Sequence, residues 1–243
     1  MIDYDREAAV YDGTRGGEAR AAAVFEAVAP LLPPRGTLLD VACGTGIVSA
    51  RFAGPQRTVI GVDRSIGMLS VAAGRLAGRA VSGDAAGLPV ASGRVDAVLM
   101  VWLLHLLPSA GPALREAVRV LAPGPGSRVV TTVDKSAAWF AAPSDLASVT
   151  GPWRDGRYAA DGFEVVASEL GRHGLRPVGE ATFPGVGQGR SPWGWREAVR
   201  AGQVSWARRD PEGVERALAA LPDQDSARPE PIYRVVAFAS PGG

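Results

Sequence analysis

The chain has 243 residues, of which 47% are hydrophobic and 21% charged, and its formal net charge is +1. This balance is typical of a globular protein with a sizeable core, and it argues against a nucleic-acid substrate, whose phosphates need a basic footprint. No apolar run reaches the ~18 residues of a membrane span. The single cysteine, Cys43, excludes an intrachain disulfide and a cysteine zinc cluster, so we expect no metal site and a reducing, cytoplasmic setting.

Short apolar runs alternate with amphipathic segments up to residue 133. The spacing of apolar residues predicts four helices, over 18–32, Ile47–Ala53, Ser65–Leu76 and Pro112–Leu121. Ser65 can be the N-cap of the third. The runs between them predict five strands, over Thr37–Val41, Thr58–Val62, Arg79–Ser82, Val95–Val101 and Ser127–Val133. The run Val95–Val101 is the most apolar, which favours a central place in a sheet.

The alternation is interrupted after Asp134 and returns near the end of the chain. A helix is expected over 161–173, with strands over Pro177–Phe183 and Tyr233–Ala239. The excursion over 184–231, with helices near 193–207 and 211–221, has the length of a lid or binding element. We therefore expect one α/β domain over 1–243, with a Rossmann-like seven-stranded, mostly parallel sheet, helices on both faces and a helical insertion before the last strand.

A glycine-rich turn follows the first strand, in the sequence from Asp40 to Gly46. Glycines let the backbone turn tightly and approach a ligand, and the N–H groups that follow can face an anion. By itself the turn fits NAD, FAD or S-adenosylmethionine (SAM), and it also fits a purely structural strand–helix connection.

Acidic residues stand at the ends of the next two strands. Asp63 is placed to accept the hydroxyls of a ribose, and Asp84 to accept a hydrogen bond from an adenine amino group. Either residue alone could simply cap a helix or a turn. Together with Asp40 they lie at three successive strand ends, the edge at which open α/β sheets bind ligands.

The combination of these motifs resembles the class I SAM-dependent methyltransferases that act on small molecules. The matching segments are Asp40–Gly46, Val62–Leu69, Gly83–Ala85 and Val95–His105. The resemblance implies a cofactor site, with Asp63 on the ribose and Asp84 on the adenine. Its residues would be Tyr11, Arg15, Asp40, Ala42, Cys43, Gly44, Gly46, Asp63, Arg64, Met68, Asp84, Ala85 and Val101.

The N-terminal segment resembles the helices that cover SAM in this family. Tyr4-Asp5 and Tyr11-Asp12 carry this likeness, and it implies cover helices over 1–32. Arg15 is a candidate for the SAM carboxylate.

Two departures from the family pattern affect the interpretation. Ala42 replaces the first glycine of the usual turn, and residues 136–231 match no motif, so the acceptor is not specified. An NAD fingerprint read from Gly44 would place Ser49 at its third glycine, which is a weak match. SAM is therefore favoured over NAD.

The candidate residues for the acceptor site follow the fourth strand or lie in the insertion. His105 is the candidate for a general base or a positioning group, because an imidazole titrates near neutral pH; a loop-holding histidine is the alternative. Arg190 is either a partner for an acidic acceptor or a solvated surface charge. Candidate acceptor contacts are Tyr4, Trp102, Trp139, Arg190 and Trp193, with 184–231 forming part of the pocket.

The sequence thus predicts methyl transfer from SAM to a small apolar or aromatic acceptor, with S-adenosylhomocysteine (SAH) as the second product. O-methylation in secondary metabolism is the leading hypothesis, and N- or C-transfer stays open. The rivals are an NAD-dependent oxidoreductase, a SAM-binding protein without catalysis, and an RNA methyltransferase, which the charge disfavours. We expect a monomer or homodimer without a nucleic-acid or membrane partner.

Overall fold

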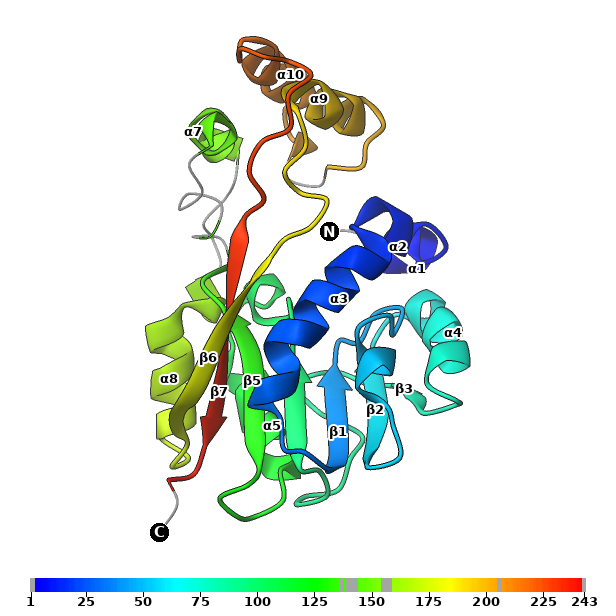
Figure 1. The fold of residues 1–243 in the computed structure, drawn as a ribbon, viewed down its shortest axis with the longest axis vertical. Coiled ribbons are helices and arrows are strands. Elements are labelled where there is room, and N and C mark those ends of the chain that lie inside the picture. Colours follow the sequence, from blue (N-terminus) through cyan, green and yellow to red (C-terminus); the bar gives the residue numbers. More distant parts are fainter. Residues whose placement is uncertain (1–2, 136–137, 139–143, 154–158, 205–206, 242–243) are drawn as a thin grey trace.

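The protein is built on one seven-stranded sheet, seen in a computed structural model that describes residues 3–135, 138, 144–153, 159–204 and 207–241 (Figure 1). The strand order is β3-β2-β1-β4-β5-β7-β6. Only β7 is antiparallel to its neighbours, β5 and β6. The strands are β1 Gly36–Val41, β2 Arg57–Asp63, β3 Ala80–Ser82, β4 Ala97–Met100, β5 Arg128–Val133, β6 Arg176–Pro184 and β7 Ile232–Ala239. The predicted fold class is confirmed.

Helices cover both faces of the sheet. The α-helices are α1 Tyr4–Glu7, α2 Tyr11–Thr14, α3 Gly17–Val28, α4 Ile66–Arg75, α5 Gly111–Val120, α7 Asp145–Thr150, α8 Phe163–Gly171, α9 Pro192–Arg200 and α10 Pro211–Ala219. Short 3-10 helices are η1 Ala29–Leu31, η2 Ser49–Phe52, η3 Leu104–Leu106, η4 Gly151–Trp153 and η5 Ala159–Asp161.

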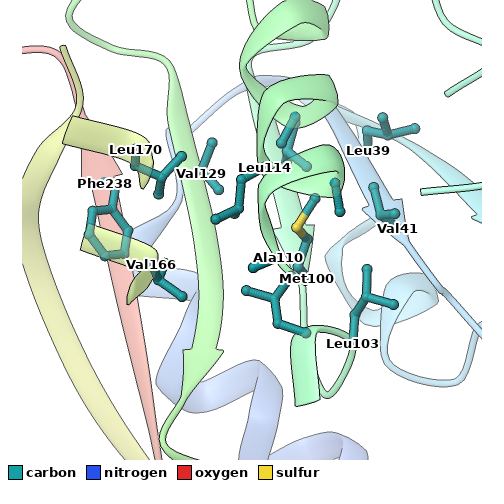
Figure 2. Close-up of a cluster of buried hydrophobic side chains, with 14 of the residues drawn as sticks. Leu39, Val41, Met100, Leu103, Ala110, Leu114, Val129, Val166, Leu170 and Phe238 are labelled. Atoms are coloured by element: carbon teal, nitrogen blue, oxygen red, sulfur yellow. The ribbon is translucent and has the colours of Figure 1, made fainter. Parts of the chain in front are cut away.

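The core consists of two apolar layers on either side of the sheet. On one face, side chains of α5 and α8 such as Leu114, Val166 and Leu170 pack on β4 and β5 (Figure 2). On the other face, α3 and α4 contribute Val24, Leu69 and neighbouring residues. All four residues of β4 are buried on both faces, which confirms its predicted central position and explains its uninterrupted apolar sequence.

Local sequence determines where the helices begin that follow the carboxyl ends of the strands. Ser65 caps α4, because its hydroxyl accepts a hydrogen bond from the Met68 N–H at 3.1 Å, as predicted. The predicted α-helix over Ile47–Ala53 is wrong: only the 3-10 helix η2 forms there. Gly54 and Pro55 end the segment at once, and the Ser49 hydroxyl turns inward to Asp40, which leaves too little chain for a regular helix.

The insertion between β6 and β7 shares a small hydrophobic core with α7, which precedes β6 in the chain. Leu146 of α7, Trp195 and Val199 of α9, and Val214 and Leu218 of α10 form it. Figure 1 shows α7, α9 and α10 beyond the end of the sheet, at the same end as α1 and α2. We call the segment 184–231 the lid. In the described part of the chain, no helix has the length and apolarity needed to cross a bilayer.

Candidate cofactor and acceptor site

The glycine-rich turn after β1 adopts a backbone conformation that leaves room for a ligand. Ala42, Gly44 and Gly46 have φ values of 63°, 56° and 73°, in the left-handed region that favours glycine. A Cβ added to Gly44 would meet nothing within 4 Å, whereas one on Gly46 would lie 3.2 Å from the Cβ of Ala72. Gly44 therefore faces open space, and Gly46 permits close packing on α4.

Asp63 links this turn to the start of α4. One carboxylate oxygen accepts the Gly44 N–H at 2.8 Å, and the other accepts the Ser65 N–H at 2.9 Å. Each oxygen keeps a second lone pair. Asp84, beyond β3, accepts the N–H of Ala86 at 2.8 Å within its own loop. The sheet order places both residues at the carboxyl ends of neighbouring strands.

Asp40 differs from the other two carboxylates because it is buried, with only 4% of its surface exposed. It accepts a hydrogen bond from the Ser49 hydroxyl at 2.5 Å. Burial raises the pKa of Asp40 to about 7, and the nearby Asp63 acts in the same direction. Because it is buried, Asp40 is better placed to stabilise the turn than to contact a ligand directly.

The remaining predicted cofactor residues lie around the turn with different exposures. Cys43 is buried and fills the space beside Gly61, and burial raises the pKa of its thiol. Met68 is 1% exposed, although the resemblance placed it beside the adenine. Ala85 and Val101 pack at the margins of the two core layers, and Arg64 is exposed.

The N-terminal helices are fastened over this edge by two aspartates that the sequence analysis did not assign to specific contacts. Asp5 accepts hydrogen bonds from the Ser65 hydroxyl and the Gly67 N–H, both at 2.7 Å. Asp12 accepts the Thr45 hydroxyl at 2.6 Å and forms an ion pair with Arg75 at 2.7 Å. The repeated Tyr-Asp pairs were the only sequence signal for these contacts.

Aromatic and cationic side chains of the cover lie beside the same edge. Tyr4 and Tyr11 have ring centroids 6.1 Å apart. Burial, followed by Tyr11, raises the pKa of Tyr4 to about 12, and Asp63 adds to the effect. Arg15 pairs with Glu7 at 3.3 Å, yet its buried Nε has no hydrogen-bond partner among the described residues. Such an orphaned donor is suited to a ligand carboxylate.

Trp102 follows β4 in a conformation that is rare for a bulky residue. Its φ is 58°, and its backbone N–H donates to the Thr132 hydroxyl at 2.9 Å. Strain of this kind persists where the surroundings enforce it, and it clusters at functional sites. The Trp102 ring meets Phe183 and Tyr233 edge-on, at centroid distances of 5.6 and 6.1 Å.

His105 is half-buried and lies near two positively charged side chains. Its Nε2 lies 2.9 Å from the Nζ of Lys135, which follows the end of β5. Burial, then Lys135 and then Arg20 lower the pKa of His105 to about 2. The imidazole is therefore neutral at physiological pH, but it takes up a proton poorly. The residues Lys135 and Arg20 were not singled out from the sequence, because only the fold brings them to His105.

The predicted acceptor contacts of the lid do not converge on one point. Trp193 is 45% exposed, and the guanidinium groups of Arg196 and Arg200 on its own helix lie 5.3 and 5.5 Å from its ring. Trp139 lies outside the described residues. Arg190 is half-buried, and its Nη2 donates to the Thr14 carbonyl at 3.0 Å, which joins the lid to the cover.

The glycine turn, the acidic strand ends and the sheet order together define the class I methyltransferase fold. Comparison with known sequences agrees, because residues 39–126 match a family described as a methyltransferase domain. The chain therefore has the class I methyltransferase fold, and residues 39–126 within it are similar to a methyltransferase domain, as the resemblance predicted. SAM is the cofactor that this similarity implies.

Curated relatives match part of this chain. The demethylmenaquinone methyltransferase of Mycolicibacterium vanbaalenii is 33% identical over 129 residues, which are 49% of this chain and 56% of that protein. The ubiquinone/menaquinone biosynthesis C-methyltransferase UbiE of Methylobacterium nodulans is 38% identical over 120 residues, 45% of this chain and 48% of that protein. The chain thus matches about half the length of these relatives.

Solved structures share the fold over nearly the whole chain. The [4+2]-cyclase SpnF has a TM-score of 0.62 at 20% identity, covering 99% of this chain and 94% of that one. Geranyl diphosphate methyltransferase in complex with GPP and sinefungin has a TM-score of 0.51 at 17% identity, covering 91% and 77%. At these identities the likeness shows the fold alone.

The residues around the turn fit SAM chemically. The open space at Gly44 leaves room for a ligand, Asp63 and Asp84 are acceptors for ribose and adenine donors, and the orphaned Arg15 Nε is a donor for a carboxylate. The cover also lies over the start of α4, where Asp5 contacts Gly67.

Proposed function

We propose that this protein is an enzyme that transfers the methyl group of SAM to a small apolar or aromatic acceptor bearing a hydroxyl group, and releases SAH. The observation that carries the proposal is the left-handed turn with open space at Gly44, joined to Asp63 at 2.8 Å. It lies within the segment that matches a methyltransferase domain.

The chain's own residues would hold the cofactor at three points. Asp63 accepts the ribose hydroxyls through its remaining lone pairs, Asp84 accepts the adenine amine, and Arg15 pairs with the methionine carboxylate. Asp40 supports the turn through Ser49. When bound, SAM supplies a methyl group that its positive sulfonium already activates for attack.

The acceptor would lie between the end of β4 and the lid. Trp102 would form an aromatic wall there, and its ring meets the buried Phe183 and Tyr233 edge-on. Two curated relatives are named for methylation in quinone biosynthesis, and a hydroxylated ring of that kind fits such a wall. Segment 184–231 and Trp193 belong to the lid that would close the pocket.

His105 would act as a positioning residue in this reaction. A group with a pKa near 2 is a weak base, and its Nε2 is engaged with Lys135. Rate enhancement would come from placing the acceptor atom in line with the methyl group and excluding water. The cover and the lid would provide that exclusion, joined by the contact between Arg190 and Thr14.

Incubation with SAM carrying a labelled methyl group, against a panel of hydroxylated naphthalenes, quinols and catechols, tests the proposal. We expect label in one class of organic product and one SAH per methyl transferred. NMR of the product distinguishes O-methylation, our leading hypothesis in secondary metabolism, from the C-methylation for which one relative is named.

Binding of SAM without any methyl transfer would instead favour a SAM-binding protein with another role. One structural neighbour with this fold is described as a [4+2]-cyclase, so the fold also occurs in a protein that is not named as a methyltransferase.

A further inference from the structure

A buried arginine, a half-buried lysine and a neutral histidine lie next to the carboxyl ends of β4 and β5. Arg20 comes from α3 and contacts Trp102, while Lys135 follows β5 and contacts His105. In the sheet, β4 lies between β5 and β1, and β1 carries the glycine turn. The three residues therefore lie near the same edge of the sheet as the turn.

Arg20 is buried beside the Trp102 ring. It is 9% exposed, and its guanidinium carbon lies 3.5 Å from the centre of the Trp102 ring. Its Nη1 donates to the Arg15 carbonyl at 3.0 Å, and its buried Nε has no hydrogen-bond partner among the described residues. No ion pair to Arg20 occurs within that part of the chain. A buried charge without a partner is strongly destabilising.

Two carboxylates that interact electrostatically with these cations also accept backbone N–H groups. Glu230 interacts electrostatically with Arg20, but its oxygens accept the N–H groups of residues 187–189 at 2.6 to 2.8 Å. Asp161 accepts the backbone N–H of Lys135 at 2.9 Å and interacts electrostatically with its side chain. The Nζ of Lys135 lies 2.9 Å from the Nε2 of His105, and both Lys135 and Arg20 lower the pKa of His105.

We infer that Arg20 and Lys135 form a binding site for an oxyanion of the methyl acceptor, positioned by Trp102 and His105. The inference rests on the proposed function and names the substrate class: an acidic phenol or enol that is bound in its ionised form. His105 is then a positioning residue for Lys135, and no protein base is required.

The chemistry balances without a further reagent. The acceptor hydroxyl loses its proton to solvent before or during binding, because two adjacent positive charges lower its pKa. An oxygen lone pair of the acceptor then forms the new C–O bond. The C–S bond breaks with its electron pair going to sulfur. The sulfonium cation thereby becomes a neutral thioether, and the acceptor oxyanion becomes a neutral ether.

A pair of dyes of nearly equal shape tests this inference on the intact, SAH-loaded protein. The probe 2-hydroxy-1,4-naphthoquinone is an anion at neutral pH, and 2-methoxy-1,4-naphthoquinone is neutral. We expect the anion to bind at least tenfold more tightly, which corresponds to ~1.4 kcal/mol. Lys135→Met should remove most of this preference and Lys135→Arg should retain it, with SAH affinity unchanged in both.

Arg172→Met serves as the matched control, since it removes one exposed positive charge directly after α8 and should leave the preference intact. Equal binding of the two dyes, or binding of neither, would overturn the inference. So would an unchanged preference in Lys135→Met. If Arg20→Met weakened SAH binding while the dye preference persisted, Arg20 would belong to the cofactor carboxylate instead.

The two proposals fail in different ways. Absence of SAM and SAH binding to the wild-type protein would remove the proposed function itself. Normal SAH binding with no preference for the anionic dye would remove only the oxyanion site.

Discussion

Substitution of Asp63 by alanine separates its role in the fold from its role in binding. The side chain accepts two backbone N–H groups, at 2.8 and 2.9 Å, with or without a ligand. Hydrogen bonds to a charged group contribute about 1.5–3 kcal/mol each, so loss of both lowers the free energy of unfolding by ~3–6 kcal/mol before the loop relaxes. The ribose contacts add to this only in the complex.

We therefore expect Asp63→Ala to weaken SAM binding by about 1–3 kcal/mol, the scale of a lost charged hydrogen bond. That loss corresponds to an increase of roughly 5- to 150-fold in Kd. Titration calorimetry measures the affinity, and denaturant unfolding without ligand measures the stability. Asp225→Ala, at an exposed position of the lid, is the matched control and should change neither. Unaltered SAM affinity in folded Asp63→Ala would refute the ribose role.

Three further substitutions test the surroundings of the turn. Gly61→Ala should lower stability by ~1–3 kcal/mol through overpacking, because its Cβ would lie 2.7 Å from the Cys43 sulfur. Asp12→Ala breaks the half-buried ion pair with Arg75 and should speed SAM release up to about fivefold, measured by stopped flow. Asp40→Asn should be more stable than the wild type at pH 8 and about equal at pH 4. The folded-state pKa of Asp40 is raised from 3.8 to about 7, so ionisation in the unfolded chain disfavours folding progressively between these values.

Each of these expectations has an outcome that contradicts it. Wild-type stability in Gly61→Ala would mean that Cys43 and its neighbours repack freely. An unchanged SAM release rate in Asp12→Ala would show that the cover is not held by that ion pair. A stability difference between wild type and Asp40→Asn that does not change from pH 4 to pH 8 would exclude the raised pKa as its cause.

The regular part of the fold could be predicted because it depends on neighbours in sequence. The uninterrupted apolar run of β4, the cap at Ser65 and the acids after β2 and β3 are all local signals. Local chemistry also indicated that a long excursion precedes the last strand. The failure at Ile47–Ala53 arose because Ser49 bonds to Asp40, a contact that helix propensity does not include.

The acceptor side could not be predicted, since its contacts join distant segments. Arg190 meets Thr14 across 176 positions, and Lys135 meets His105 across 30. Arg20 appeared to be one more charge on an amphipathic helix, yet the fold buries it against Trp102. The assignment of His105 as a base rested on its pKa in solution, which burial and two cations change.

Calorimetric titration of the intact chain with SAM, followed by a separate titration with NAD, tests the cofactor assignment most directly. We predict saturable binding of one SAM per chain and no detectable binding of NAD. Tight binding of NAD without binding of SAM would contradict the account.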